Sequence, residues 1–272
     1  MPHTFDEDFG KNFQLGKNPE LQIIADASDP NTANTLINYI SSIVMSFTHE
    51  KNINNKISLI NTEFRMRYNE ELKGVYLFVP GLITIILMLV SAMMTSISIT
   101  KEKELGTMEL MLVSPMKPYT VIIAKVIPYT FLSIINSAII LILGKFVFDV
   151  PIQGSLILLM AEIILFILSA LSLGILISSI TDSQQVALMI SLVGLLLPVI
   201  LLSGFIFPLE NMPLWLQYFA NIIPAKWFMI IIKSIMLKGS GITHIWLETL
   251  LLAGFTLVFA LISVVKFKMR LE

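Results

Sequence analysis

The chain has 272 residues, of which 56% are hydrophobic and only 14% are charged, with a net charge of −1. A soluble domain carries about 25% charged residues, so this composition and the mean hydropathy of +0.83 predict a helical protein with several membrane spans. The small net charge excludes a general polycation for nucleic acid, and the lack of cysteine excludes disulfides, thiolate metal sites and thiol catalysis.

Residues 1–76 are polar, precede every long apolar run, and are predicted to form a small α/β domain. Their first twenty residues are expected to be irregular. Leu21–Ala25 is a short apolar run typical of a strand, and Asp29-Pro30 is typical of a helix start, where aspartate caps free N–H groups. Residues 57–68 alternate between apolar and charged side chains, which predicts a second strand. Asp26 with Asp29 could form a carboxylate pair, but a turn followed by a helix cap is favoured.

Five apolar runs follow, each long enough to cross a hydrocarbon core of roughly 30 Å. They cover residues 77–98, 119–143, 155–177, 186–207 and 246–265. The sequence therefore predicts an all-α polytopic membrane domain over residues 77–272.

The stretch Ile99–Pro118, between the first two runs, is charged. Its charged side chains near the first span are Lys101, Glu102, Lys103, Glu104 and Glu109. Charges are costly at bilayer depth, so this stretch is predicted to be a turn that stands in water. Gly106 is expected to end the helix that leaves the first span, and Thr107 to cap a short apolar helix over residues 107–114. Such a short helix is unstable alone, and either a soluble partner or the lipid surface would cover its apolar side.

Residues 208–241 form a mixed segment in which Pro208, Pro213 and Pro224 forbid one continuous helix. We expect two short helices, one that starts at Pro213 and one that starts at Trp227. Aromatic side chains beside lysines are typical of the headgroup level, so the segment is predicted to enter the outer interface and return.

Lysine and arginine near the spans predict the orientation, because these residues are enriched on the cytoplasmic side. The side of the charged turn and the C-terminus carries Lys101, Lys103, Lys117, Lys266, Lys268 and Arg270. The other side carries Lys145, Lys226, Lys233 and Lys238. The turn and the C-terminus are therefore expected in the cytoplasm, with residues 1–76 outside. Because no signal peptide precedes that domain, either the tail is translocated or a first helix is missing, and the missing helix is favoured.

Catalytic and nucleotide-binding motifs are absent: the sequence has no Walker A, HExxH, G-x-S-x-G or GxGxxG pattern. No catalytic residue, metal site or bound cofactor is predicted. Glu162 is the one carboxylate well inside a span, and it is either a transport-pathway residue or a group that reaches outward to the interface or pairs with a neighbour. Asn136 is a second, weak pathway candidate, with interhelical packing as its alternative role.

The segment Glu102–Pro115, EKELGTMELMLVSP, resembles the signature of ABC-2-type exporter permeases, the membrane subunits of ATP-driven efflux systems. The proline-rich segment SGFIFP at residues 203–208 and its continuation resemble the family's re-entrant region. The resemblance implies that residues 107–114 are a coupling helix seated in a cleft of a separate ATPase. The residues it assigns to ATPase coupling are Glu102, Glu104, Gly106, Thr107, Glu109, Leu110 and Pro115.

The same resemblance implies the partners and the location. Two permeases form the pathway, ATP and Mg²⁺ are used by the partner ATPase, and a periplasmic adaptor is a further expected partner. The family places the chain in the bacterial inner membrane, and usually has six helices with a large extracytoplasmic domain after the first. We predict an exporter subunit for an amphiphilic, drug-like or lipid-like substrate. The alternatives are a non-transporting scaffold or truncated permease, and a lipid-modifying membrane enzyme, which would need converging catalytic residues.

Overall fold

The computed structural model describes residues 3–5, 9–15, 17, 20–51, 60–107 and 118–269. The chain divides into two compact units, Met1–Leu77 and Phe78–Glu272, which are described separately.

The first unit is a three-stranded sheet with helices. Its elements are β1 (His3–Phe5), α1 (Phe9–Gln14), β2 (Glu20–Asp26), α2 (Pro30–Lys51) and β3 (Asn61–Arg67). Strand β2 is central, antiparallel to β1 and parallel to β3, with Ile23 opposite Phe64. Along β3 the apolar residues are partly buried and the charged residues are exposed, in the alternation that the sequence predicts. The expectation that the first twenty residues are irregular was wrong, because they contribute β1 and α1.

Helix α2 begins where the sequence predicts. The side chain of Asp29 accepts hydrogen bonds from the N–H groups of Asn31 and Thr32, at 3.0 and 3.2 Å. Asp26 instead accepts from the N–H of Ser28, at 3.0 Å. The two aspartates therefore hold a turn and a helix cap, as favoured from the sequence.

We expect Asp29→Ala to loosen the start of α2, because two N–H groups lose their acceptor. An N-cap is worth about 1 kcal/mol, so amide exchange in the first turn of α2 should quicken about fivefold. Hydrogen-exchange mass spectrometry of the purified chain measures this. Asn34→Ala, at an exposed position of the same helix, is the control, and equal protection in both variants would contradict the prediction.

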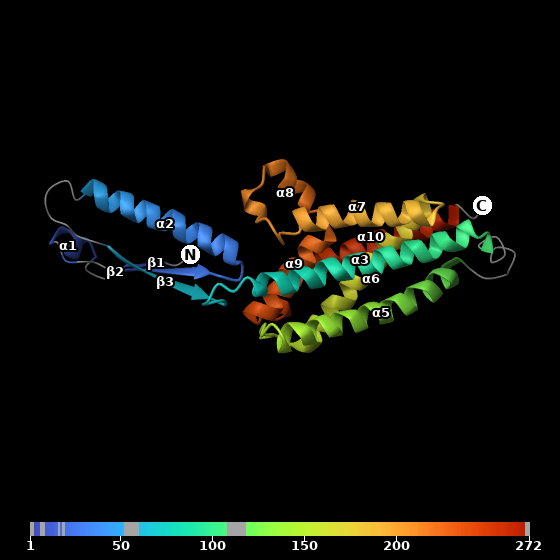
Figure 1. The fold of residues 1–272 in the computed structure, drawn as a ribbon, viewed down its shortest axis with the longest axis horizontal. Coiled ribbons are helices and arrows are strands. Elements are labelled where there is room, and N and C mark those ends of the chain that lie inside the picture. The colour runs from blue at the N-terminus through green and yellow to red at the C-terminus, as the bar shows by residue number, and fades with distance from the viewer. Residues whose placement is uncertain are drawn as a thin grey trace. The chain divides into compact units, whose positions relative to one another are not determined.

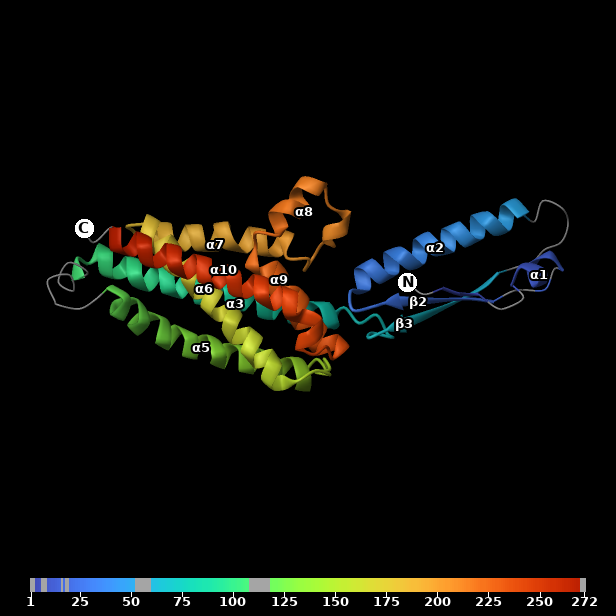
Figure 2. The same ribbon diagram turned by 180° about the vertical axis from the view of Figure 1, so that it is seen from behind.

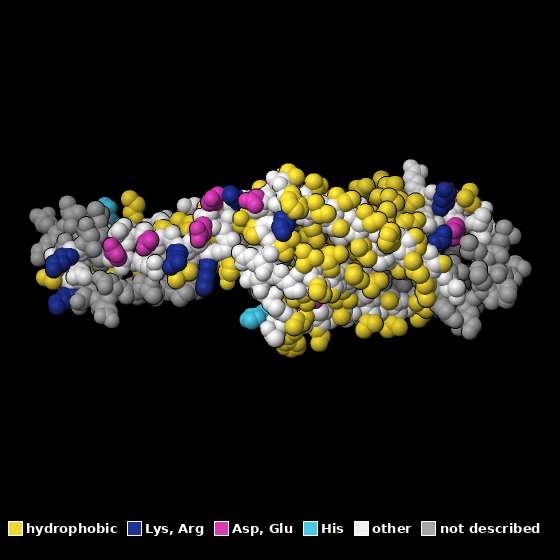
Figure 3. Space-filling view, turned by 90° about the horizontal axis from the view of Figure 1, so that it is seen from below, with side chains coloured by type: hydrophobic (Ala, Val, Ile, Leu, Met, Phe, Trp, Pro, Cys, Tyr) yellow, Lys and Arg dark blue, Asp and Glu magenta, His cyan; other side chains and the backbone are white. Residues whose placement is uncertain are grey.

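The second unit is a helical bundle (Figures 1 and 2). Its elements are α3 (Val75–Glu104), α5 (Pro118–Phe146), α6 (Leu156–Ile180), α7 (Gln184–Leu202), η2 (Leu209–Asn211), α8 (Leu214–Ala220), α9 (Pro224–Lys238) and α10 (Ile242–Met269). Five of the described helices, α3, α5, α6, α7 and α10, are long and apolar enough to cross a membrane. Hydrophobic side chains cover most of this unit on the face in Figure 3, which suits a lipid surround.

The buried core of the bundle lies around α6, which packs against α5, α9 and α10. Its residues Leu159, Ile163, Phe166 and Ile167 are fully buried. Helices α5, α7 and α10 are much less buried than α3 and α6. The first and third spans are therefore the inner helices of this unit.

Several helix boundaries differ from the expected spans by a few residues, and three of these differences have a clear local cause. Helix α3 continues through Glu104, six residues beyond the predicted end of the first span at Ser98. Helix α7 ends at Leu202 rather than residue 207, since the chain turns at Gly204, where the backbone φ is +75°. Helix α9 begins at Pro224, three residues before the predicted start at Trp227, because proline is well tolerated in a first helical turn.

Candidate functional site

The charged end of α3 is defined by a sharp helix stop. The last helical hydrogen bonds run from Leu105 N–H to Lys101 O and from Gly106 N–H to Lys103 O. Gly106 has a φ of +70°, a left-handed conformation that favours glycine and ends the helix, as the sequence predicts. The side chain of Thr107 turns back and donates to the carbonyl of Glu102 at 3.1 Å.

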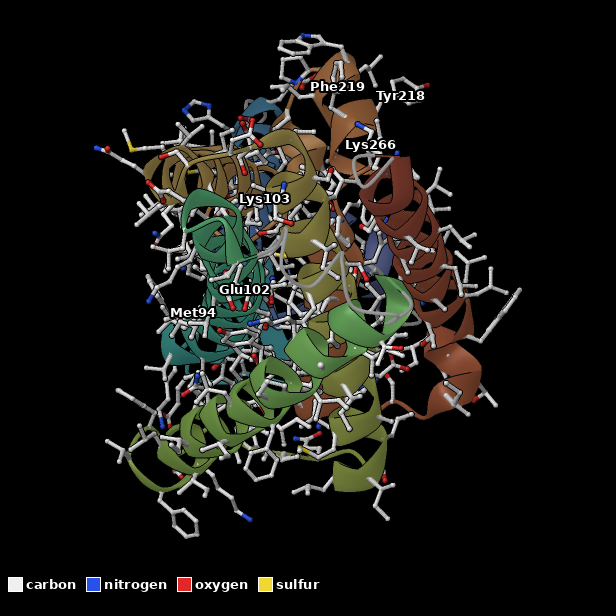
Figure 4. All side chains as sticks on the ribbon, turned by 90° about the vertical axis from the view of Figure 1, so that its right-hand side faces the viewer. Met94, Glu102, Lys103, Tyr218, Phe219 and Lys266 are labelled. Atoms are coloured by element: carbon white, nitrogen blue, oxygen red, sulfur yellow. The ribbon has the colours of Figure 1, made fainter. Side chains whose placement is uncertain are left out.

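Three consecutive residues of this helix end contact three different helices. Glu102 forms an ion pair with Lys125 of α5, and both side chains are largely buried. The Lys103 amine donates to the carbonyl of Ser178 and, at 3.2 Å, to that of Thr181, at the end of α6. Figure 4 looks at this end of the bundle and labels Glu102 and Lys103.

Glu104 contacts the start of α7. One carboxylate oxygen accepts from the backbone N–H of Gln184 at 3.2 Å and from its side-chain amide at 2.9 Å. The end of α3 is thus bonded to α5, to the last turn of α6 and to the first turn of α7.

The predicted coupling residues fall partly inside this site. The structure brings together Glu102, Glu104, Gly106 and Thr107. Glu109, Leu110 and Pro115, with most of the predicted helix 107–114, lie outside the described residues. Sequence reasoning did not select Lys103, Lys125 or Gln184. A usable signal existed: consecutive helical residues point about 100° apart, so three successive charges cannot face the same neighbour.

The carboxyl group of Glu162 lies between α6 and α10. The residue is 3% exposed, and the Thr249 hydroxyl donates to its Oε1 at 2.8 Å. Its Oε2, and Oε2 of Glu248, are buried without a hydrogen-bond partner in the described part of the chain. Glu162 therefore pairs with a neighbouring helix instead of reaching outward. Asn136 is half-buried and lies on a different helix, α5, from Glu162 and Thr249.

The proline-rich segment forms two α-helices, α8 and α9, as expected, after the short 3-10 helix η2. Pro208 precedes η2, Pro213 precedes α8, and Pro224 opens α9, with α8 and α9 bent by 81°. Tyr218 and Phe219 project from α8 away from the bundle (Figure 4), and both are exposed.

The second half of this segment is inserted into the bundle. Phe228 of α9 stacks on Phe166 of α6, with ring centroids 4.1 Å apart and an angle of 1° between the rings. The backbone N–H of Gln153, in the loop before α6, donates to the backbone carbonyl of Met236 in α9 at 3.0 Å. Helix α9 is therefore a buried part of the bundle, while α8 is exposed.

These features define a multi-pass helical membrane protein with a charged, multiply bonded turn at one end and a bent helix pair. The chain belongs to the ABC-2 family of transporter proteins, whose profile matches residues 3–265.

Three proteins of Escherichia coli K12 are similar to it. The probable multidrug ABC transporter permease YbhS is 33% identical over 93% of this chain and 68% of its own length. The probable multidrug ABC transporter permease YbhR is 34% identical over 89% of this chain and 66% of its own length. The inner membrane transport permease YhhJ is 31% identical over 98% of this chain and 73% of its own length.

Proposed function

We propose that this chain is the membrane-spanning permease of an ATP-driven exporter that moves an amphiphilic, drug-like or lipid-like substrate out of the cytoplasm or the inner leaflet. The observation that carries the proposal is the family match over residues 3–265, which includes the charged turn. The names of YbhS and YbhR support an amphiphilic substrate. ATP and Mg²⁺ belong on a separate ATPase chain, since the sequence has no nucleotide-binding motif.

The charged turn and the C-terminus lie in the cytoplasm in this proposal, and residues 1–76 lie outside, in a bacterial inner membrane. The end of α3, the start of α5, the α6–α7 turn and the end of α10 lie at one end of the bundle, which supports a common side for them (Figure 1). The excess of lysine and arginine at this end favours the cytoplasmic side. The name of YhhJ supports the inner membrane.

The proposed assembly has two permeases, each bound to an ATPase subunit, in a lipid surround and with a periplasmic adaptor as a further partner. ATP binding closes the ATPases, and each presses on a coupling helix over residues 107–114. The helix–turn–helix of α3 and α5 carries the movement toward the pathway, as an element with two discrete positions. Glu162 and Asn136 are pathway candidates, and Glu162 is the stronger because its Oε2 atom is buried without a hydrogen-bond partner among the described residues.

We expect Glu109→Lys to abolish export and the stimulation of ATP hydrolysis, because a reversed charge in the coupling helix disrupts its seat on the ATPase. Ethidium efflux and ATP hydrolysis in vesicles that contain the permease and its ATPase measure both effects. Glu50→Lys makes the same charge reversal at an exposed position of α2 and should leave both unchanged.

A cross-link tests the contact directly, because the chain has no cysteine and a single introduced thiol is unique. A thiol cross-linker on Thr107→Cys should capture the ATPase subunit. Failure to capture it, together with full activity of Glu109→Lys, would overturn the proposed coupling role of this turn.

A further inference from the structure

The α6–α7 turn is short, and it caps the end of α6 in part with its own Thr181, whose hydroxyl donates to the carbonyl of Ile177 at 2.9 Å. Helix α6 ends at Ile180 and α7 begins at Gln184, so only residues 181–183 connect them. The N-cap residue of α7, Ser183, makes no side-chain cap hydrogen bond. Helix ends leave N–H and carbonyl groups without partners inside the helix, so the last carbonyls of α6 and the first N–H groups of α7 can take further partners from other helices.

Helix α3 supplies two such partners, and each has the charge that the helix dipole favours at that end. Lys103 places its amine on the carbonyls of Ser178 and Thr181, at the negative end of α6. Glu104 places its carboxylate on the N–H of Gln184, at the positive end of α7. Lys103 and Glu104 are adjacent residues of α3, and they cap the end of α6 and the start of α7 respectively.

We propose that Lys103 and Glu104 are positioning residues that fix the α6–α7 turn to the end of α3, so that both move as one body during transport. This inference rests on the proposed function and extends it. The movement reaches α6 and α7 through these caps, in addition to α5. Because α6 is the central buried helix and carries Glu162, the caps connect the cytoplasmic end to the centre of the bundle.

A simple lever of α3 and α5 makes a different prediction. In that mechanism the end of α3 swings past a stationary α6–α7 turn, and the bonds of Lys103 and Glu104 break in each cycle. The two mechanisms differ in whether the distance between residues 104 and 184 changes during transport.

The test is a reversible bridge between these positions in the otherwise cysteine-free chain. Glu104→Cys and Gln184→Cys are combined, assembled with the ATPase in vesicles, and bridged with a short bifunctional methanethiosulfonate reagent. Because the double variant lacks the Glu104 carboxylate, we expect it to transport less ethidium than the unmodified chain, and we expect bridging to restore its transport. Loss of transport on bridging, with recovery after reduction, would overturn the proposal. Each single-cysteine variant, treated with the same reagent, controls for modification alone.

A second experiment removes the Lys103 cap by substitution instead of cross-linking the two elements. We expect Lys103→Met to lower the ethidium transported per ATP hydrolysed by about tenfold, while ATPase binding and hydrolysis persist. Lys103→Arg should restore the ratio, since it keeps the positive charge. Lys101→Met, at an exposed lysine two residues earlier, is the matched control.

An unchanged ratio in Lys103→Met would overturn the proposal. A wild-type chain that neither binds an ATPase nor transports ethidium would instead contradict the proposed function, so the two failures can be distinguished.

Discussion

Gly174→Leu is expected to prevent assembly of the helical bundle. A Cβ atom at Gly174 of α6 would lie 2.4 Å from the carbonyl oxygen and 3.0 Å from the Cα of Ala92 in α3. These are backbone atoms of a neighbouring buried helix, so no side-chain rotation relieves the contact. Membrane helices associate largely through close packing at small residues, and overpacking costs about 1–3 kcal/mol or more.

The measurement is the amount of monodisperse protein recovered in detergent, with its thermal unfolding temperature. Gly254→Leu is the matched control, because nothing lies within 4 Å of a Cβ at that position of α10. Gly174→Ala should fall between the two. Equal recovery of Gly174→Leu and Gly254→Leu would show that the α3–α6 crossing is not close packed.

Phe228→Ala is expected to release α9 from the bundle core. The Phe228 ring stacks on Phe166, and both side chains are fully buried. Truncation removes an aromatic pair and leaves a cavity beside α6. Such a change costs about 3–5 kcal/mol in a well-packed core. We therefore expect a large fall in thermal stability and faster proteolysis of the segment that connects α7 to α9.

Phe219→Ala on α8 is the control for this variant. That ring is exposed, so its loss should have little effect on stability. Thermal unfolding in detergent and limited proteolysis compare the two variants. If Phe228→Ala is as stable as Phe219→Ala, α9 is held by its other contacts and the stacked pair contributes little.

The main elements of the bundle could be predicted because their signals are local. Apolar runs located the five spans, and Gly106 marked the helix stop because a φ of +70° favours glycine. Prolines likewise marked the interrupted segment before α8 and α9. The apolar pattern of the first span ends at Ser98, but α3 continues to Glu104, next to the predicted stop at Gly106, because a helix can continue into water beyond its apolar residues.

The bonds of the candidate site could not be predicted because they join distant parts of the chain. Lys103 lies 75 and 78 positions from its two acceptors, and Glu104 lies 80 positions from Gln184. Charges at a helix end are visible in the sequence, but only the packing of α3 beside the α6–α7 turn decides which groups they contact. Thr249 was missed as the partner of Glu162 for the same reason, since α6 and α10 are separate elements.

The capping of α6 and α7 by residues of α3 limits which segments can be exchanged between related permeases. A loop that carries its own caps can be exchanged between related permeases as a module, but here the caps belong to another hairpin. A graft of the segment from Lys101 to Pro118 alone would bring foreign charges to unchanged helix ends. Under the proposed coupling to an ATPase, an exchange of this segment should therefore include the turn around Thr181–Gln184, and substitutions at the two places should occur in pairs.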